Sequence, residues 1–134
     1  MAIYSLRMTN IKRSDGRSAV GASAYRARAN LKDDRTGKSY SYSSKQDLLF
    51  NQIYSHIDLP ENLTSLYQVW NKAEEAEKRV NSVVAREFLI ALPKELTEKQ
   101  NIELTEEIAK TLCQRFEFIA QASIHNEKDD DKGN

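Results

Sequence analysis

The chain has 134 residues, of which 40% are hydrophobic and 30% are charged. This length suits one domain with a modest core, and the composition is ordinary for a globular protein. No stretch reaches the roughly 18 apolar residues that a membrane span needs, and no secretory signal pattern opens the chain. The single cysteine, Cys113, cannot form an internal disulfide, which suits a reducing compartment. We therefore expect a cytoplasmic protein that has no contact with a membrane.

Charge is spread unevenly along the chain. Basic and acidic residues balance at 20 each, which by itself argues against a strongly basic nucleic-acid-binding protein. Residues 1–38, however, hold nine basic and three acidic side chains, whereas the remainder holds eleven and seventeen. A basic N-terminal third attracts phosphate groups through counterion release. Ion pairing between the two halves of the chain explains the same asymmetry, so charge alone leaves both interpretations open.

The first elements follow a strand, helix and hairpin order. Apolar and polar side chains alternate over residues 2–9 and predict a strand, and a polar, basic loop follows over 10–16. A helix is predicted from about residue 18 to residue 30. This helix is rich in alanine and glycine, so we expect it to pack closely on a neighbouring layer. Residues 33–44 predict a hairpin that turns around Gly37.

The middle of the chain contains one ambiguous segment. Residues 48–57 fit a strand or a helix, because their apolar positions follow neither period clearly. A break over 58–62 precedes a predicted helix over 64–79. Residues 83–92 form the clearest strand, since β-branched and aromatic residues dominate there.

The last elements complete an α+β pattern. Thr97 and Gln100 form a capping-box pattern for a helix over 98–116, and a strand follows over 118–125. The polar, acidic residues 126–134 predict a loop or a frayed end. The order of elements predicts an antiparallel sheet with helices packed on one of its faces.

Tyr25 is the first candidate for chemistry. It stands among small residues, and Arg26 and Arg28 follow it. A tyrosine can attack phosphorus to give a covalent phosphotyrosyl intermediate, but a phenol ionises near neutral pH only beside positive charge or a metal. The two arginines offer such charge. The alternative is an amphipathic packing residue whose hydroxyl reaches the rim of the core.

His125 and Glu87 are further candidates, each in a predicted strand. His125 ends its strand on a polar face and suits a metal ligand, although a lone histidine there is often merely exposed. A carboxylate inside a strand, such as Glu87, is costly if it is buried without a partner. It therefore points to a functional site, where it can orient a metal-bound histidine. Pairing with Arg86 or another cation explains it equally well.

These residues belong to a set of motifs that resembles the MobA/MobL (MobQ-type) relaxases of mobilisable and conjugative plasmids. The motifs include Ala-Tyr-Arg around Tyr25, Ala-Arg-Glu ending at Glu87 and Ser-Ile-His ending at His125. Other matching blocks cover residues 1–4, 13–20, 34–38, 70–77 and 91–96. Each block is weak alone, but together they run through nearly the whole chain in the family's order.

The resemblance implies a fold, a reaction and a cofactor. We expect an HUH-type catalytic domain, an antiparallel sheet flanked by helices. Tyr25 would attack the scissile phosphate at a plasmid transfer origin, leaving a 5′-phosphotyrosyl adduct and a free 3′ hydroxyl. His125 matches the first of three metal-binding histidines, and Glu87 matches an acidic residue with a supporting role. A divalent cation, Mg²⁺ or Mn²⁺, would polarise the phosphate as a Lewis acid.

The implied partners are single-stranded DNA at the transfer origin, relaxosome accessory proteins and a type IV secretion coupling protein. Single-stranded DNA would follow a basic groove. The candidate DNA-binding residues are the basic side chains Arg7, Lys12, Arg13, Arg17, Arg26 and Arg28.

The sequence departs from the family in its metal ligands. A Pro-His-x-His pair follows the first histidine in the family, and no such motif occurs in these 134 residues. We expect residues 1–125 to form a partial relaxase (nickase) domain that is inactive or weak at nicking, with 126–134 as a polar tail. Two alternatives remain. One is a non-enzymatic remnant that binds single-stranded DNA or a relaxosome partner, and the other is a small structural domain with a coincidental likeness.

Overall fold

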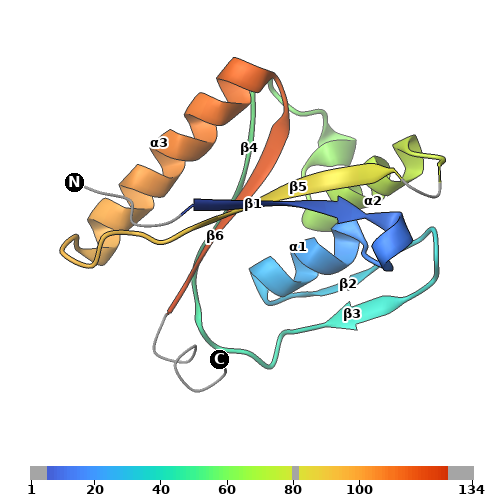
Figure 1. Ribbon diagram of the computed structural model, residues 1–134, viewed down its shortest axis with the longest axis horizontal. Coiled ribbons are helices and arrows are strands. Elements are labelled where there is room, and N and C mark those ends of the chain that lie inside the picture. Colours follow the sequence, from blue (N-terminus) through green and yellow to red (C-terminus); the bar gives the residue numbers. More distant parts are fainter. Residues whose placement is uncertain (1–5, 80–81, 127–134) are drawn as a thin grey trace.

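The computed structural model describes residues 6–79 and 82–126. In chain order (Figure 1), the elements are β1 (Leu6–Lys12), the 3₁₀ turn η1 (Arg13–Asp15), α1 (Ala19–Ala27), β2 (Asn30–Lys32), β3 (Ser39–Ser41), β4 (Leu48–Ser55), the 3₁₀ turn η2 (Glu61–Leu63), α2 (Leu66–Ala76), β5 (Val83–Ile90), α3 (Glu98–Phe116) and β6 (Ile119–His125). None of the helices in the described ranges has the length and apolar character needed to cross a membrane.

The strands pair as three antiparallel, two-stranded sheets within the described residues. In the β1–β5 sheet, Thr9 lies opposite Glu87. In the β4–β6 sheet, Leu48 lies opposite His125. The hairpin of β2 and β3 forms the third sheet. Antiparallel strands with three helices packed on them confirm the predicted α+β class.

Helices cover both faces of the β4–β6 sheet, not one face as expected. Ala120 and Ala122 of β6 pack against the core around Cys113 of α3. Gln121, between them, accepts hydrogen bonds from Ser23 of α1 at 2.6 Å and from Trp70 of α2 at 2.8 Å. Successive side chains of a strand point to opposite faces. Therefore α3 lies on one side of β6, and α1 and α2 lie on the other (Figure 1).

Side-chain caps set the N-terminal boundaries of the three α-helices in the described residues. The hydroxyl groups of Ser18 and Thr97 accept the backbone N–H of the third helical residue, at 3.1 Å in both α1 and α3. Gln100 completes the capping box that the sequence predicts for α3. α1 ends earlier than expected, because Arg28 takes a left-handed conformation with φ 51° and ψ 49°.

Other boundaries differ from the sequence-based expectations. β1 continues to Lys12, into a stretch expected to be a loop, and the ambiguous segment 48–57 forms β4. Residues 2–5 of the predicted first strand and all of the predicted tail except Asn126 lie outside the described residues.

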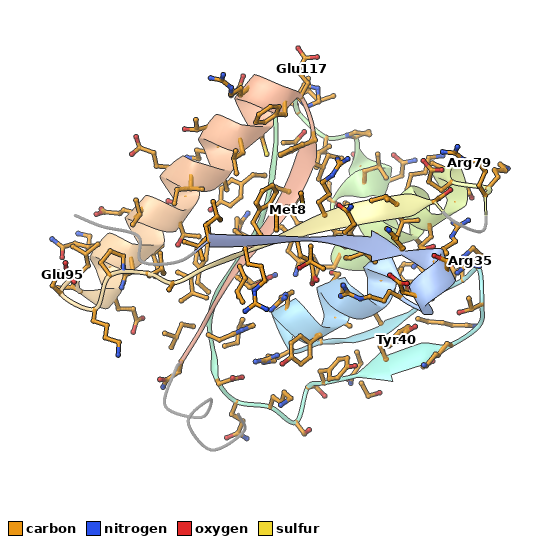
Figure 2. The ribbon with its side chains drawn as sticks, in the orientation of Figure 1. Met8, Arg35, Tyr40, Arg79, Glu95 and Glu117 are labelled. Carbon is orange, nitrogen blue, oxygen red and sulfur yellow. The ribbon has the colours of Figure 1, made fainter. Side chains whose placement is uncertain are left out.

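Gly21 of α1 lies against the Tyr40 ring of β3, which stands beside the helix (Figure 2). A Cβ at position 21 would lie 2.7 Å from a ring carbon. In an open helix position, alanine in place of glycine would stabilise the protein. Here we expect Gly21→Ala to lower the free energy of unfolding in urea by about 1 kcal/mol, because the ring must move.

The matched control is the same substitution in a Tyr40→Ala background. Without the ring, alanine at position 21 should become neutral or stabilising. A Gly21→Ala single variant that is more stable than the parent would contradict the close packing of α1 on β3.

Candidate functional site

Tyr25 lies in the last turn of α1 with 39% of its surface exposed. The Tyr42 ring meets it edge to face, with centroids 5.3 Å apart and planes at 87°. Charged groups also surround the Tyr25 ring. The centroid lies 4.5 Å from the guanidinium carbon of Arg28, 5.6 Å from that of Arg26 and 5.9 Å from the Lys45 ammonium. The phenol therefore stands at the surface between an aromatic ring and three cations.

Arg28 is neutralised by a carboxylate that the sequence did not single out. Its Nε and Nη2 atoms donate to the two carboxylate oxygens of Asp47 at 2.7 and 2.9 Å, and both side chains are buried. The third nitrogen, Nη1, donates to the backbone carbonyl of Tyr25 at 2.7 Å. Arg28 therefore holds the end of α1 and leaves little free charge for a ligand.

The Arg28 hydrogen bonds lower the pKa of the Asp47 carboxyl to about 2. A carboxyl pKa that is lowered in the folded protein stabilises the fold at pH values above the ordinary carboxyl pKa. This stability is lost as the pH falls toward 2. We expect Asp47→Asn to cost on the order of 1–2 kcal/mol of unfolding free energy at neutral pH. Between pH 4 and pH 2 the gap between parent and variant should close. A gap that is independent of pH in urea unfolding would contradict this assignment.

His125 ends β6 with one ring nitrogen on the backbone of α1. Its Nε2 atom lies 2.7 Å from the carbonyl oxygen of Arg26. A carbonyl only accepts hydrogen bonds, so Nε2 carries the proton and Nδ1 carries the lone pair. Burial lowers the pKa of His125, which favours the neutral ring. A metal-binding histidine commonly donates its second N–H to a backbone carbonyl in this way.

The described residues do not form a complete metal site. Within residues 6–79 and 82–126, no three histidine, cysteine or acidic side chains gather in a way that could hold a metal ion. His125 therefore supplies a single candidate ligand there, and we derive no chemical step through a metal.

Glu87 joins two arginines from different parts of the chain. Oε1 of Glu87 accepts from Arg17 at 2.9 Å, and Oε2 accepts from Arg26 at 3.2 Å. The side chains of Arg17 and Arg26 are 36% and 33% exposed. The carboxylate is thus paired with cations other than its neighbour Arg86, and it fixes the arginine that directly follows Tyr25.

The remaining DNA-binding candidates lie along and after β1. Arg7 and Lys12 are exposed strand residues opposite Leu89 and Val83. Arg13 is different, because its side chain is only 7% exposed and its guanidinium is paired with Glu74. The structure therefore brings Arg26 and Arg28 to the Tyr25 ring, and it brings His125 to the backbone carbonyl of Arg26. Arg17 and Glu87 join this group through Arg26. The structure places Arg13 in an internal ion pair.

Glu74 is a second carboxylate whose role was missed. It is fully buried in α2, where Oε1 accepts from Nε of Arg13 and Nε of Arg35 at 3.2 Å each. Oε2 accepts the backbone N–H of Ala19 at 2.6 Å. Negative charge is favourable at a helix N-terminus, where N–H groups lack partners within the helix. Glu74 thus anchors the start of the helix that carries Tyr25.

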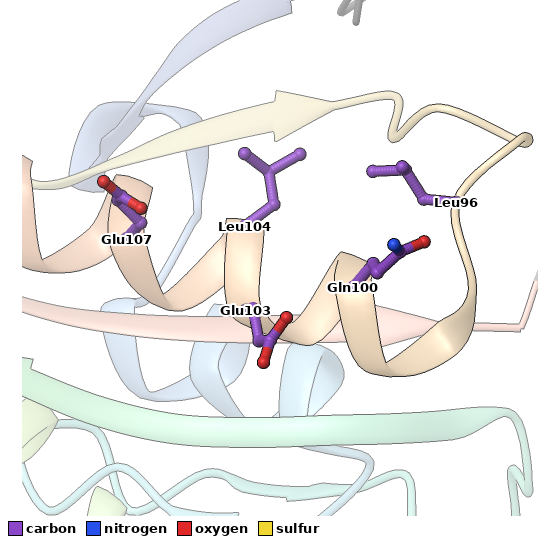
Figure 3. Close-up of a pocket in the computed structure, with 5 residues that line it drawn as sticks. All are labelled: Leu96, Gln100, Glu103, Leu104 and Glu107. Carbon is purple, nitrogen blue, oxygen red and sulfur yellow. The ribbon is translucent and has the colours of Figure 1, made fainter.

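One hollow in the described residues lies elsewhere, along α3. It measures about 250 Å³ and runs along the N-terminal half of α3 (Figure 3), where it is lined by Leu96, Gln100, Glu103, Leu104 and Glu107. Two carboxylates would repel a phosphate, and α3 packs on the opposite face of β6 from α1. This hollow is therefore not part of the Tyr25 region.

Comparison with known proteins decides the family. Residues 17–134 match the sequence model of the MobA/MobL family. The chain belongs to this family. It is a member of the mobilisation relaxases that the motifs around Tyr25, Glu87 and His125 resemble.

Relatives of the MobA/MobL chain carry names from plasmid transfer. The mobilization protein MobL of Acidithiobacillus ferridurans is 40% identical over 126 residues, which cover 93% of this chain and 32% of MobL. The conjugal transfer protein TraA of Agrobacterium fabrum is 33% identical, over 82% of this chain and 11% of TraA. The chain thus spans about a third of MobL and about a tenth of TraA.

A solved structure shares the fold of this MobA/MobL chain. It comes from work titled "Molecular Basis of Vancomycin Resistance Transfer in Staphylococcus aureus". The TM-score is 0.79 at 27% sequence identity, and the match covers 92% of this chain and 70% of that structure. The likeness supports the relaxase fold that the sequence motifs imply.

Proposed function

We propose that this chain is the nucleophile-bearing part of a DNA relaxase that acts at a plasmid transfer origin. The phenolic oxygen of Tyr25 attacks the scissile phosphate of single-stranded DNA. A bond forms between this oxygen and phosphorus, and the bond from phosphorus to the 3′ oxygen breaks. The phenol releases its proton as it attacks, and the 5′ end becomes a phosphotyrosyl ester. The 3′ oxygen leaves and takes up a proton, so the proton count balances. The exposed phenol beside the cations of Arg26 and Lys45 is the observation that carries this proposal.

Arg26 is the best placed residue to bind the phosphate. It is a third exposed, it adjoins Tyr25, and Glu87 holds its guanidinium. Glu87 shares its charge between Arg17 and Arg26, so this cluster keeps an excess of positive charge. Glu87 is then a positioning residue, because it acts through Arg26 rather than on the DNA. Lys45 adds a further cation 5.9 Å from the centre of the Tyr25 ring.

A divalent cation, Mg²⁺ or Mn²⁺, supplies Lewis-acid chemistry in this proposal. Among the described residues, the candidate ligand that the family motif gives is His125, with Nδ1 as the atom that carries the lone pair. Mg²⁺ keeps its waters and needs several anchors. We therefore expect these residues alone to bind single-stranded DNA but to cleave it weakly. Binding without cleavage, to DNA or to a relaxosome partner, is the second candidate function.

The test measures DNA binding and covalent attachment separately. A fluorescent, single-stranded transfer-origin oligonucleotide with Mn²⁺ is mixed with this chain and with a version extended past Asn134 by a family segment that carries the Pro-His-x-His pair. We expect both proteins to raise its anisotropy, and the extended version to give an adduct that survives SDS. Binding without any adduct by the extended version would favour the second candidate. Absence of binding by either protein would contradict both candidates.

The two arginines that pair with Glu87 are expected to contribute to the binding of single-stranded DNA. Replacing Arg17 and Arg26 with alanine removes two phosphate-binding candidates. We expect about a tenfold loss of affinity and a shallower salt dependence. Lys72→Ala is the matched control, because Lys72 pairs with Glu75 on the exposed surface of α2. An equal loss in the control, or no loss in the double variant, would rule out this surface as the DNA site.

A further inference from the structure

Asp47 connects two chain segments that are far apart in sequence. Its carboxylate binds Arg28, which ends the helix carrying Tyr25. Its backbone carbonyl accepts the N–H of Asn126 at 2.7 Å, directly after His125. One residue, at the entry to β4, therefore contacts both the end of α1 and the end of β6.

The contact with α1 reaches the Tyr25 ring through Arg28. Two parallel hydrogen bonds to one carboxylate fix the plane of the guanidinium. The same guanidinium donates to the Tyr25 carbonyl and lies 4.5 Å from the centre of its ring. Tyr42 adds an edge-to-face contact 5.3 Å away. An exposed tyrosine would otherwise change rotamers freely, and these contacts limit it.

The contact with β6 closes a ring of hydrogen bonds that connects the end of α1, residue 47 and the end of β6. His125 binds the carbonyl of Arg26, one residue after Tyr25, and Asn126 binds the carbonyl of Asp47. The ends of α1 and β6 are thus joined directly and also through residue 47. The position of the Tyr25 phenol relative to the His125 imidazole depends on these hydrogen bonds.

Energetics favour a positioning role over a purely stabilising one. A buried ion pair repays its desolvation only partly, so it is weak evidence of net stability, yet removing one partner leaves an uncompensated charge. The pKa of Asp47 is lowered, so the pair stays charged at neutral pH. Its bidentate geometry defines an orientation that an apolar contact would not define.

We propose that Asp47 is a positioning residue for the nucleophile, acting through Arg28 on the Tyr25 ring and through its own carbonyl on the end of β6. The role rests on the proposed function of Tyr25. It assigns to the entry of β4 a part in the reaction that neither the sequence motifs nor the comparisons give it.

The test uses Asp47→Asn, with Glu106→Gln as a control. Glu106 belongs to α3, on the other face of β6, and it accepts a hydrogen bond from the Tyr54 hydroxyl at 2.8 Å. Arg28→Lys is a second variant, which keeps the charge but loses the paired hydrogen bonds. Chains labelled with ¹³C in the tyrosine rings report on Tyr25 by NMR, without DNA or metal. Single-turnover adduct formation by the extended version reports on catalysis.

We expect Asp47→Asn to shift or broaden the Tyr25 ring signal and leave that of Tyr67 unchanged. Adduct formation should slow by about tenfold to a hundredfold, since small misplacements of reacting groups have effects of this size. DNA affinity should change less than about threefold, because Arg17 and Arg26 remain. Arg28→Lys should act in the same direction, and Glu106→Gln should change neither readout.

Two results would overturn the positioning role. One is an unchanged Tyr25 signal in both variants, and the other is an equal change in the Glu106→Gln control. If Asp47→Asn does not fold, Arg28→Lys carries the same two readouts. Failure of the extended version with the parent residues to form an adduct refutes the proposed function alone, because the NMR comparison still measures the ring. A shifted ring with an unchanged adduct rate refutes the positioning role alone.

Discussion

Replacing Tyr25 with phenylalanine is expected to abolish covalent attachment to DNA in the extended protein. The substitution removes the only atom that forms the ester and keeps the ring, which still packs against Arg28 and Tyr42. Loss of a nucleophile lowers turnover by at least about a thousandfold. Binding of single-stranded DNA should change by less than about threefold, because the hydroxyl supplies little ground-state affinity. Denaturing gels and anisotropy measure the two effects on the same samples.

Two other tyrosines provide matched controls. Tyr42→Phe removes the hydroxyl of the ring that packs edge to face on Tyr25, and it should keep adduct formation within about tenfold of the parent. Tyr67→Phe removes a hydroxyl that binds Asp34 and should have no effect on attachment. An adduct formed by the Tyr25→Phe protein at the parent's rate would eliminate Tyr25 as the nucleophile.

Glu74→Gln is expected to produce a large loss of stability. The neutral amide leaves Arg13 and Arg35 without their shared carboxylate. It also places an N–H donor or a weaker acceptor next to the backbone N–H of Ala19. Breaking a buried ion pair by removing one partner costs about 3–5 kcal/mol. Urea unfolding followed by circular dichroism measures the difference in the free energy of unfolding.

The neighbouring residue offers a direct control for this loss. Glu75 pairs with Lys72 on the exposed side of the same helix, where its side chain is 72% exposed. Glu75→Gln should change the free energy of unfolding by less than about 1 kcal/mol, because exposed pairs contribute little. If the two glutamines had equal effects, Glu74 would not be the anchor of α1.

Secondary structure was predictable where the signal was local. The capping box of Thr97 and Gln100 and the β-branched run of β5 each lie within a few residues, and both predictions are confirmed. Residues 48–57 were ambiguous, because a short apolar run has no decisive period. Their pairing with β6, about 70 residues later, makes them a strand. The faces that each helix covers also depend on such distant contacts.

The candidate site was predictable only in part, and mainly through the family motifs. Tyr25 and its arginines are adjacent in sequence, whereas Asp47 lies 19 residues from Arg28 and Glu74 lies 61 residues from Arg13. Nothing local to either carboxylate reveals its partner. The same pairs account for part of the charge asymmetry. Arg13 and Arg28 belong to the basic N-terminal third, and acidic residues from the rest of the chain neutralise them. The interpretation by internal pairing therefore holds for these two arginines.

Mapping the site of covalent attachment tests the central claim most directly. The extended protein first reacts with DNA. Digestion by nuclease and trypsin then leaves a short nucleotide attached to one peptide, which mass spectrometry identifies. Tyr25 falls in the tryptic peptide 18–26, whereas Tyr40 and Tyr42 fall in 39–45. We predict a nucleotide on peptide 18–26, with fragment ions that place it on residue 25. A nucleotide on peptide 39–45, or on any other residue, would contradict the assignment of Tyr25.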